Sequence, residues 1–140
     1  MRPLQTSRLI PASPEQIFSA FTDPARLARW WGPAGFRNTF ELFQFETGGR
    51  WKYVMHGPDG RDYDNESTFV EVLPRQKVVI EHTSLPKYRL TITLEPSEVG
   101  TTVSWVQEFE KPDVARGIAH IVVPANEQNL DRLTAEVVPA

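Results

Sequence analysis

The sequence predicts an α+β fold in which a curved antiparallel β-sheet wraps around a long C-terminal α-helix. Two observations predict this fold. Residues 37–109 form a succession of short runs rich in aromatic and β-branched residues, with turn residues between them, which is typical of an antiparallel meander. Residues 113–138 instead carry apolar residues at helical spacing. A helix of that length can cover one face of the sheet.

The segment before the meander predicts a first strand followed by two short helices. Residues 4–10 have the composition of a strand. Ser13-Pro14-Glu15-Gln16 then supplies an N-cap serine, a proline at the first helical position and a glutamine that can close a capping box. Asp23-Pro24 repeats the cap-and-proline signal for a second helix. Gly32-Pro33 is expected to end that helix after Trp31.

Alternation within the meander assigns side chains to the two faces of the sheet, because neighbours along a strand point to opposite sides. One face is apolar and is expected to be the interior. The other is rich in Thr, Arg, Glu and Lys, which suits a sheet with one face in water. In residues 63–72 the apolar pattern changes sides after Phe69, so a β-bulge is expected there.

The C-terminal segment is the candidate cover for the apolar face. Its apolar stripe consists of Leu130, Leu133 and Val137. Asn126 lies one turn earlier on the same stripe. Because Pro124 removes a helical hydrogen bond, we expect either a kink there or two pieces, residues 114–122 and 125–137.

Size and composition narrow the classes of function. The chain has 140 residues and is expected to form a single domain over residues 1–140. Its net charge of −3 gives no positive field to attract phosphates, so neither nucleic acid nor a membrane is an expected partner. The absence of cysteine excludes disulfides and thiolate sites. No apolar run approaches the roughly 20 residues of a membrane span, and residues 1–10 lack a secretory apolar region, so we expect a cytoplasmic protein.

Several segments resemble a known family. Trp30-Trp31-Gly32-Pro33 and the run Gly-Gly-Arg-Trp-Lys-Tyr-Val-Met-His-Gly-Pro-Asp-Gly at 48–60 are similar to signature segments of the SRPBCC group of the START and birch-pollen-allergen-like superfamily. The similarity is to its branch related to the activator of heat-shock protein 90 ATPase. Leu73-Pro74, the Gly100-Thr101-Thr102 turn and the helix around residues 127–133 also look like the family. The resemblance therefore covers nearly the whole chain.

The resemblance implies a helix-grip fold, which is a cup that different members use for lipids, polyketides, hormones or a chaperone. The chain departs from the family at Val123-Pro124, where related helices more often run without proline. The resemblance therefore does not determine the shape of the helical roof over the cavity.

A cavity is expected between the sheet and the helix, because the concave surface is wider than one helix can fill. Its predicted lining is mainly apolar with a few polar groups, which suits a small hydrophobic molecule anchored by one or two hydrogen bonds. The predicted lining residues are Trp51, Tyr53, Met55, Phe69, Ile80, His82, Leu90, Ile92, Trp105, Gln107, Asn126 and Leu130. For the aliphatic members, simple core packing is the alternative. The polar members would need each other, water or a ligand as partners.

An enzyme is the second hypothesis. His82 as a base near Tyr53 would suit a cyclase-like or hydratase-like enzyme acting on an apolar substrate. No Gly-x-Ser-x-Gly elbow or phosphate loop is present, so binding without catalysis is favoured and no cofactor is expected. His56, His82 and His120 lack a short metal-ligand spacing, so no metal is expected. His56 is expected to be a solvated loop residue.

A protein-interaction module is the third hypothesis. On a short helix the side chains of Trp30 and Trp31 cannot point the same way, so we expect one beneath the sheet and the other at the cavity mouth or a partner surface. The resemblance implies a chaperone contact as one option, because a similar domain of the eukaryotic activator contacts heat-shock protein 90. We expect no additional amino-terminal domain of the kind those activators have, which disfavours that role. A homodimer through an outer face or a sheet edge is also compatible with the sequence.

Overall fold

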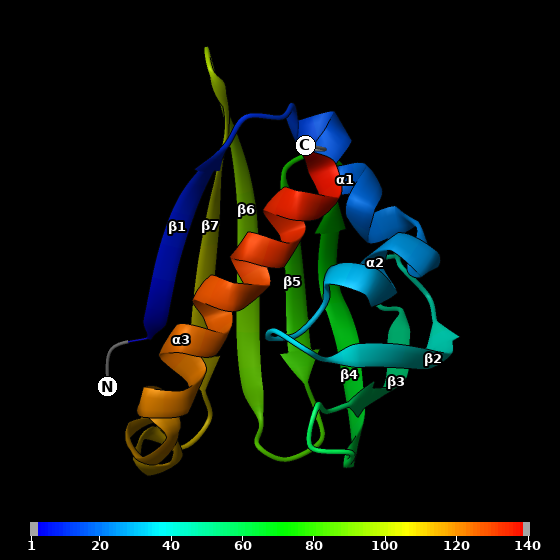
Figure 1. Ribbon diagram of the computed structural model, residues 1–140, viewed down its shortest axis with the longest axis vertical. Coiled ribbons are helices and arrows are strands. Elements are labelled where there is room, and N and C mark those ends of the chain that lie inside the picture. Colours follow the sequence, from blue (N-terminus) through cyan, green and yellow to red (C-terminus); the bar gives the residue numbers. More distant parts are fainter. Residues whose placement is uncertain (1–2, 139–140) are drawn as a thin grey trace.

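The computed structural model describes residues 3–138, and in this part of the chain a seven-stranded antiparallel sheet is combined with three helices (Figure 1). The strand order is β1-β7-β6-β5-β4-β3-β2. The expected α+β fold is therefore confirmed. In chain order the elements are β1 Leu4–Ile10, α1 Pro14–Thr22, α2 Pro24–Trp30, β2 Arg37–Phe43, β3 Arg50–His56, β4 Asp62–Leu73, β5 Lys77–His82, β6 Tyr88–Ser97, β7 Gly100–Phe109 and α3 Pro112–Val137.

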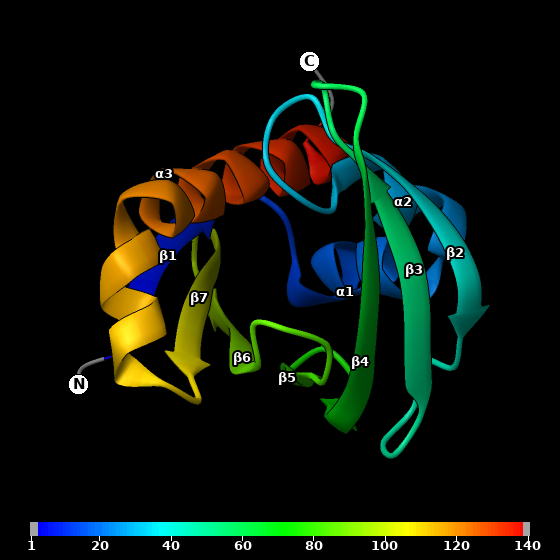
Figure 2. The same cartoon turned by 90° about the horizontal axis from the view of Figure 1, so that it is seen from below.

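The sheet is strongly curved and α3 crosses its concave side (Figures 1 and 2). Helices α1 and α2 lie on the same side, and α2 packs against β2 (Figure 2). Both short helices also contact α3. The interior is therefore enclosed by the sheet on one side and by three helices on the other.

The short helices begin where the capping signals predict. The Ser13 hydroxyl accepts a hydrogen bond from the Gln16 backbone N–H at 3.1 Å, and the Gln16 side chain accepts one from the Ser13 N–H at 2.8 Å. Asp23 caps α2 by accepting from the Ala25 N–H at 3.0 Å. The end of α2 was predicted one residue too late, because Trp31 already has an extended backbone.

A β-bulge in β4 shifts the register against β5. Phe69 pairs with Ile80, whereas Glu71 pairs with Val79, so one extra residue lies between them. As a result Val72 packs against the hydrophobic core although Val70 is exposed. The expected bulge is confirmed, and it lets Phe69 and Val72, on either side of it, both pack in the interior.

Helix α3 continues through Pro124 as one helix, so of the two expected alternatives the kink is the one present. Figure 2 shows the first turns of α3 inclined to the remainder. The two parts are packed differently. The part before the proline buries only Ala115, whereas the part after it buries Asn129, Leu130, Leu133 and Val137.

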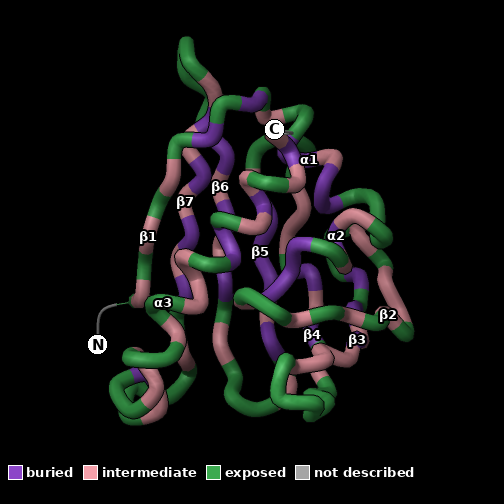
Figure 3. The backbone as a smooth tube through the Cα atoms, viewed as in Figure 1, coloured by how far each residue is buried: buried purple, intermediate pink, exposed green. Residues whose placement is uncertain are grey.

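The core is rich in aromatic side chains, and buried residues alternate along the central strands (Figure 3). Trp30 and Trp31 both belong to it, with exposed fractions of 1% and 4%. This burial does not favour the option in which one of them forms a partner surface. Their rings lie edge-to-face in the interior, with 5.6 Å between the centroids. No helix within residues 3–138 is long and apolar enough to span a bilayer.

Candidate ligand-binding cavity

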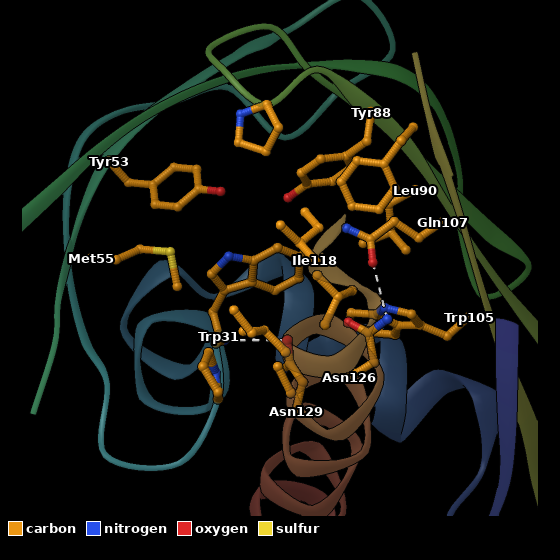
Figure 4. A pocket seen from close by; sticks show the side chains of 17 residues that line it. Trp31, Tyr53, Met55, Tyr88, Leu90, Trp105, Gln107, Ile118, Asn126 and Asn129 are labelled. Atoms are coloured by element: carbon orange, nitrogen blue, oxygen red, sulfur yellow. Dashed lines mark hydrogen bonds between the residues drawn. The ribbon is translucent and has the colours of Figure 1, made fainter. Parts of the chain in front are cut away.

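A cavity of about 200 Å³ lies between the inner face of the sheet and α3 (Figure 4). The strands β3, β6 and β7 contribute Tyr53, Met55, Tyr88, Leu90, Trp105, Gln107 and Phe109. Helix α3 contributes Ile118, Ile121, Val122, Ala125, Asn126 and Asn129. The turn after α2 adds Trp31, Gly32 and Pro33, and the β5–β6 loop adds Pro86. Most of the wall is apolar or aromatic.

Half of the twelve predicted lining residues lie on this cavity. They are Tyr53, Met55, Leu90, Trp105, Gln107 and Asn126. The other six do not line it: Trp51, Phe69, Ile80, Ile92 and Leu130 pack in the core, and His82 lies behind Tyr88. Alternation identified the correct face of the sheet. However, α1, α2 and the second part of α3 cover one end of this face, and the residues there pack in the core.

The sequence also carries a signal for the helical wall. Ile118, Ile121, Val122 and Ala125 have the spacing i, i+3, i+4 and i+7, which is one face of a helix. Tyr88 also follows from its alternation with Leu90. Trp31 lies at the cavity rather than on a partner surface.

Two tyrosines place hydroxyl groups in the cavity from different strands, Tyr53 on β3 and Tyr88 on β6 (Figure 4). The Tyr53 hydroxyl lies near the side chains of Trp31 and Ser67. Burial raises the pKa of Tyr53 to about 12, and the nearby Trp31 and Ser67 side chains partly oppose this rise. Burial also raises the pKa of Tyr88 well above its usual value, and the neighbouring Tyr53 adds to this rise. Both phenols therefore stay protonated at neutral pH and can donate hydrogen bonds.

Two amide side chains meet across the cavity. Asn126 of α3 donates from Nδ2 to Oε1 of Gln107 on β7 at 3.0 Å (Figure 4). Asn129 is used differently, because it donates to the Trp30 carbonyl at 2.9 Å and accepts from the Gly32 N–H at 3.3 Å. Asn129 therefore positions the turn after α2, while the pair between α3 and β7 ties the roof to the sheet.

Arg132 fixes the same turn from the outer side of α3. Its guanidinium donates to five backbone carbonyls, those of Arg29, Trp31, Gly32, Pro33 and Phe36. Because Arg132 has five N–H donors in a rigid fork, it can satisfy several carbonyls of one turn at once. Arg132 therefore supplies five of the side-chain hydrogen bonds to the turn that forms part of the cavity wall.

Comparison with known proteins identifies the family. The family model of the Activator of Hsp90 ATPase homolog 1-like protein matches residues 11–137. The chain belongs to this family. The resemblance stated from the sequence is therefore confirmed. No curated protein matches the chain.

Solved structures of bacterial proteins share the fold of this family member. A protein from Chromobacterium violaceum is 27% identical, with a TM-score of 0.87 and 100% of both chains covered. One from Rhodobacter sphaeroides is 25% identical, with a TM-score of 0.83 and coverage of 96% of this chain and 90% of the other. A family protein from Silicibacter pomeroyi is 24% identical, with a TM-score of 0.77 and 96% of each chain covered.

In this family member, His82 supports the cavity wall from behind. Its Nε2 lies 2.7 Å from Oδ1 of Asn65, and its Nδ1 lies 2.8 Å from the Pro86 carbonyl oxygen. Its ring stacks on Tyr88 with 4.5 Å between the centroids. Both ring nitrogens are thus engaged by protein groups and the ring does not line the cavity. This arrangement does not favour His82 as a base acting on a bound molecule.

His56 lies on the outer face of the sheet and is more constrained than a solvated loop residue. Its ring nitrogens lie 2.7 Å from the Thr39 hydroxyl and 2.7 Å from Oδ1 of Asp62. Within residues 3–138, no three His, Cys, Asp or Glu side chains gather as a metal site would require.

Acidification is expected to destabilise the protein through His82. Burial lowers the pKa of His82 below its usual 6.5, although the bond to the Pro86 carbonyl opposes this. The unfolded chain therefore takes up this proton first, and the free energy of unfolding falls as the pH drops below about 6.5. Urea denaturation between about pH 7.5 and about pH 5.5 should show a smaller loss in His82→Gln than in the wild type.

The matched control is His120→Gln, because His120 is an exposed residue on α3. The free energy of unfolding of the His120→Gln protein should change with pH as that of the wild type does. An unchanged pH dependence in the His82→Gln protein would contradict the assignment to His82.

Proposed function

We propose that this protein binds a small, mainly apolar molecule in the cavity between the sheet and α3, with no need for a cofactor or for catalysis. The observation that carries the proposal is the combination of apolar walls with a few polar groups: two phenol hydroxyls, and the buried Nε1–H of Trp105, which has no hydrogen-bond partner among the described residues. An unpaired buried polar group costs about 1–3 kcal/mol, so a molecule that supplies the missing partner gains affinity there.

The size of the cavity supports a small ligand. Pockets for drug-sized molecules occupy roughly 300–1,000 Å³. The cavity of about 200 Å³ lies below that range. A protein-interaction role has no comparable support, because the two tryptophans that would anchor a partner are buried.

Native mass spectrometry of the gently purified protein tests the proposal. We expect a non-covalent adduct that disappears on denaturation, either as purified or after incubation with a library of small apolar compounds. Ala125→Phe should abolish the adduct, because Ala125 lines the cavity and the larger side chain occupies it. Val123→Phe is the matched control, since Val123 lies on the same helix but is 49% exposed.

Two outcomes would overturn the proposal. One is an adduct that persists unchanged in the Ala125→Phe protein. The other is the absence of any adduct across the whole library.

A further inference from the structure

Several of the polar groups that face the cavity can donate hydrogen bonds. Tyr53 and Tyr88 supply two phenol hydroxyls. Trp105 lines the cavity with an exposed fraction of only 2%, and its buried Nε1–H has no partner among the described residues. Gln107 accepts from Asn126 through Oε1, which leaves the N–H groups of Gln107 as donors and Oδ1 of Asn126 as an acceptor.

Within residues 3–138, no charged side chain lines the cavity wall. The guanidinium of Arg132 lies close to the turn at Gly32 but is taken up by backbone carbonyls. A bound carboxylate would lose its hydration without meeting a counter-charge, which is costly. A bound ammonium group would likewise meet no counter-charge. An uncharged ligand avoids both penalties.

The apolar part of the wall is largely aromatic. Trp31, Tyr53, Tyr88, Trp105 and Phe109 all contribute to it. Aromatic rings pack well against another ring, in offset-stacked or edge-to-face arrangements. A planar or cyclic molecule fits such a wall better than a flexible chain, which must also lose conformational freedom on binding.

We propose that the ligand is an uncharged ring compound with a carbonyl group, and that its carbonyl oxygen accepts hydrogen bonds from the hydroxyls of Tyr53 and Tyr88. This inference rests on the proposed binding function and narrows it to one chemical class. A carbonyl oxygen has two lone pairs and carries no proton, so it can satisfy two donors at once. Figure 4 shows the two hydroxyls directed toward the same part of the cavity.

Four probes of similar size separate this class from the others. They are 4-phenylbutan-2-one, 3-phenylpropanoate, 3-phenylpropylamine and butylbenzene. Isothermal titration calorimetry near neutral pH measures their affinities. We expect the ketone to bind at least about tenfold more tightly than the carboxylate, the ammonium compound and the hydrocarbon.

Tyrosine-to-phenylalanine variants test the two donors directly. Tyr53→Phe and Tyr88→Phe should each weaken ketone binding by roughly three- to tenfold and leave butylbenzene binding unchanged, because only the ketone uses the hydroxyls. Tyr63→Phe is the matched control, since the Tyr63 hydroxyl donates to Asp59 at 2.9 Å and Tyr63 does not line this cavity.

The outcomes distinguish this inference from the proposed function. If butylbenzene binds but the ketone binds no more tightly, or the carboxylate binds best, the carbonyl inference is overturned and the binding function stands. Equal losses for the ketone and butylbenzene in both tyrosine variants would also overturn it, because they would indicate a change of cavity shape. If no probe binds and the adduct test is also negative, the binding function itself fails.

Discussion

Replacing Trp30 by alanine is expected to lower the free energy of unfolding by about 3–5 kcal/mol. The side chain is 1% exposed and packs edge-to-face against Phe21, with 4.9 Å between the ring centroids. Its Nε1–H also donates to the Ala20 carbonyl at 2.9 Å. Alanine would leave a cavity and would orphan that carbonyl, so packing and hydrogen bonding are lost together. Urea denaturation followed by far-UV circular dichroism measures the change.

The control for this variant is an aromatic residue on the surface. Tyr63 is 41% exposed, and Tyr63→Ala should cost no more than about 1 kcal/mol. If Trp30 were instead an exposed anchor for a partner protein, the two substitutions would have similarly small effects. A cost for Trp30→Ala below about 1 kcal/mol would therefore contradict the buried position described above.

Replacing Arg132 by alanine is expected to lower the free energy of unfolding by about 2–4 kcal/mol and to release the turn after α2. Five carbonyl groups lose this guanidinium at once. Those of Trp31 and Pro33 keep bonds from Asn38 Nδ2 at 2.8 Å and from the Phe36 N–H at 3.2 Å. Arg132→Lys should recover only part of the loss, because an ammonium group has three donors and no planar fork. Denaturation measures the cost, and amide hydrogen exchange in residues 31–36 measures the release of the turn.

Arg37→Ala is the matched control, because Arg37 is an exposed arginine at the start of β2. In the Arg37→Ala protein, the free energy of unfolding and the amide hydrogen exchange of residues 31–36 should stay at wild-type levels. Unchanged exchange in this turn for Arg132→Ala would show that other contacts hold it.

The parts of the fold that were predictable from the sequence depend on local chemistry. The capping box at Ser13 and Gln16 requires only residues three positions apart, so both the signal and the structure are local. The bulge after Phe69 appears in the sequence because a shift by one residue exchanges the faces of a strand. Pro124 was recognised as a point of distortion, but whether a helix bends or breaks at a proline depends on what holds its two ends.

The position of the cavity depended on contacts that the sequence does not encode locally. Phe69, Ile80 and Ile92 have the same alternation as Leu90, yet they pack in the core and Leu90 lines the cavity. The difference comes from which part of the concave face is filled by the helices. Arg132 gave no signal either, because an arginine on a helix is usually a solvated surface residue.

The four tryptophans of the chain form one continuous group around a member of the cavity wall. The ring centroid of Trp31 lies 5.6 Å from that of Trp30, 5.0 Å from that of Trp51 and 5.9 Å from that of Trp105. Indole emission depends on local polarity and on contact with quenching groups, so this protein has a single fluorescent centre rather than several scattered ones. Trp31 and Trp105 border the space that a ligand would occupy. Tryptophan fluorescence is therefore expected to report the proposed binding without an attached dye.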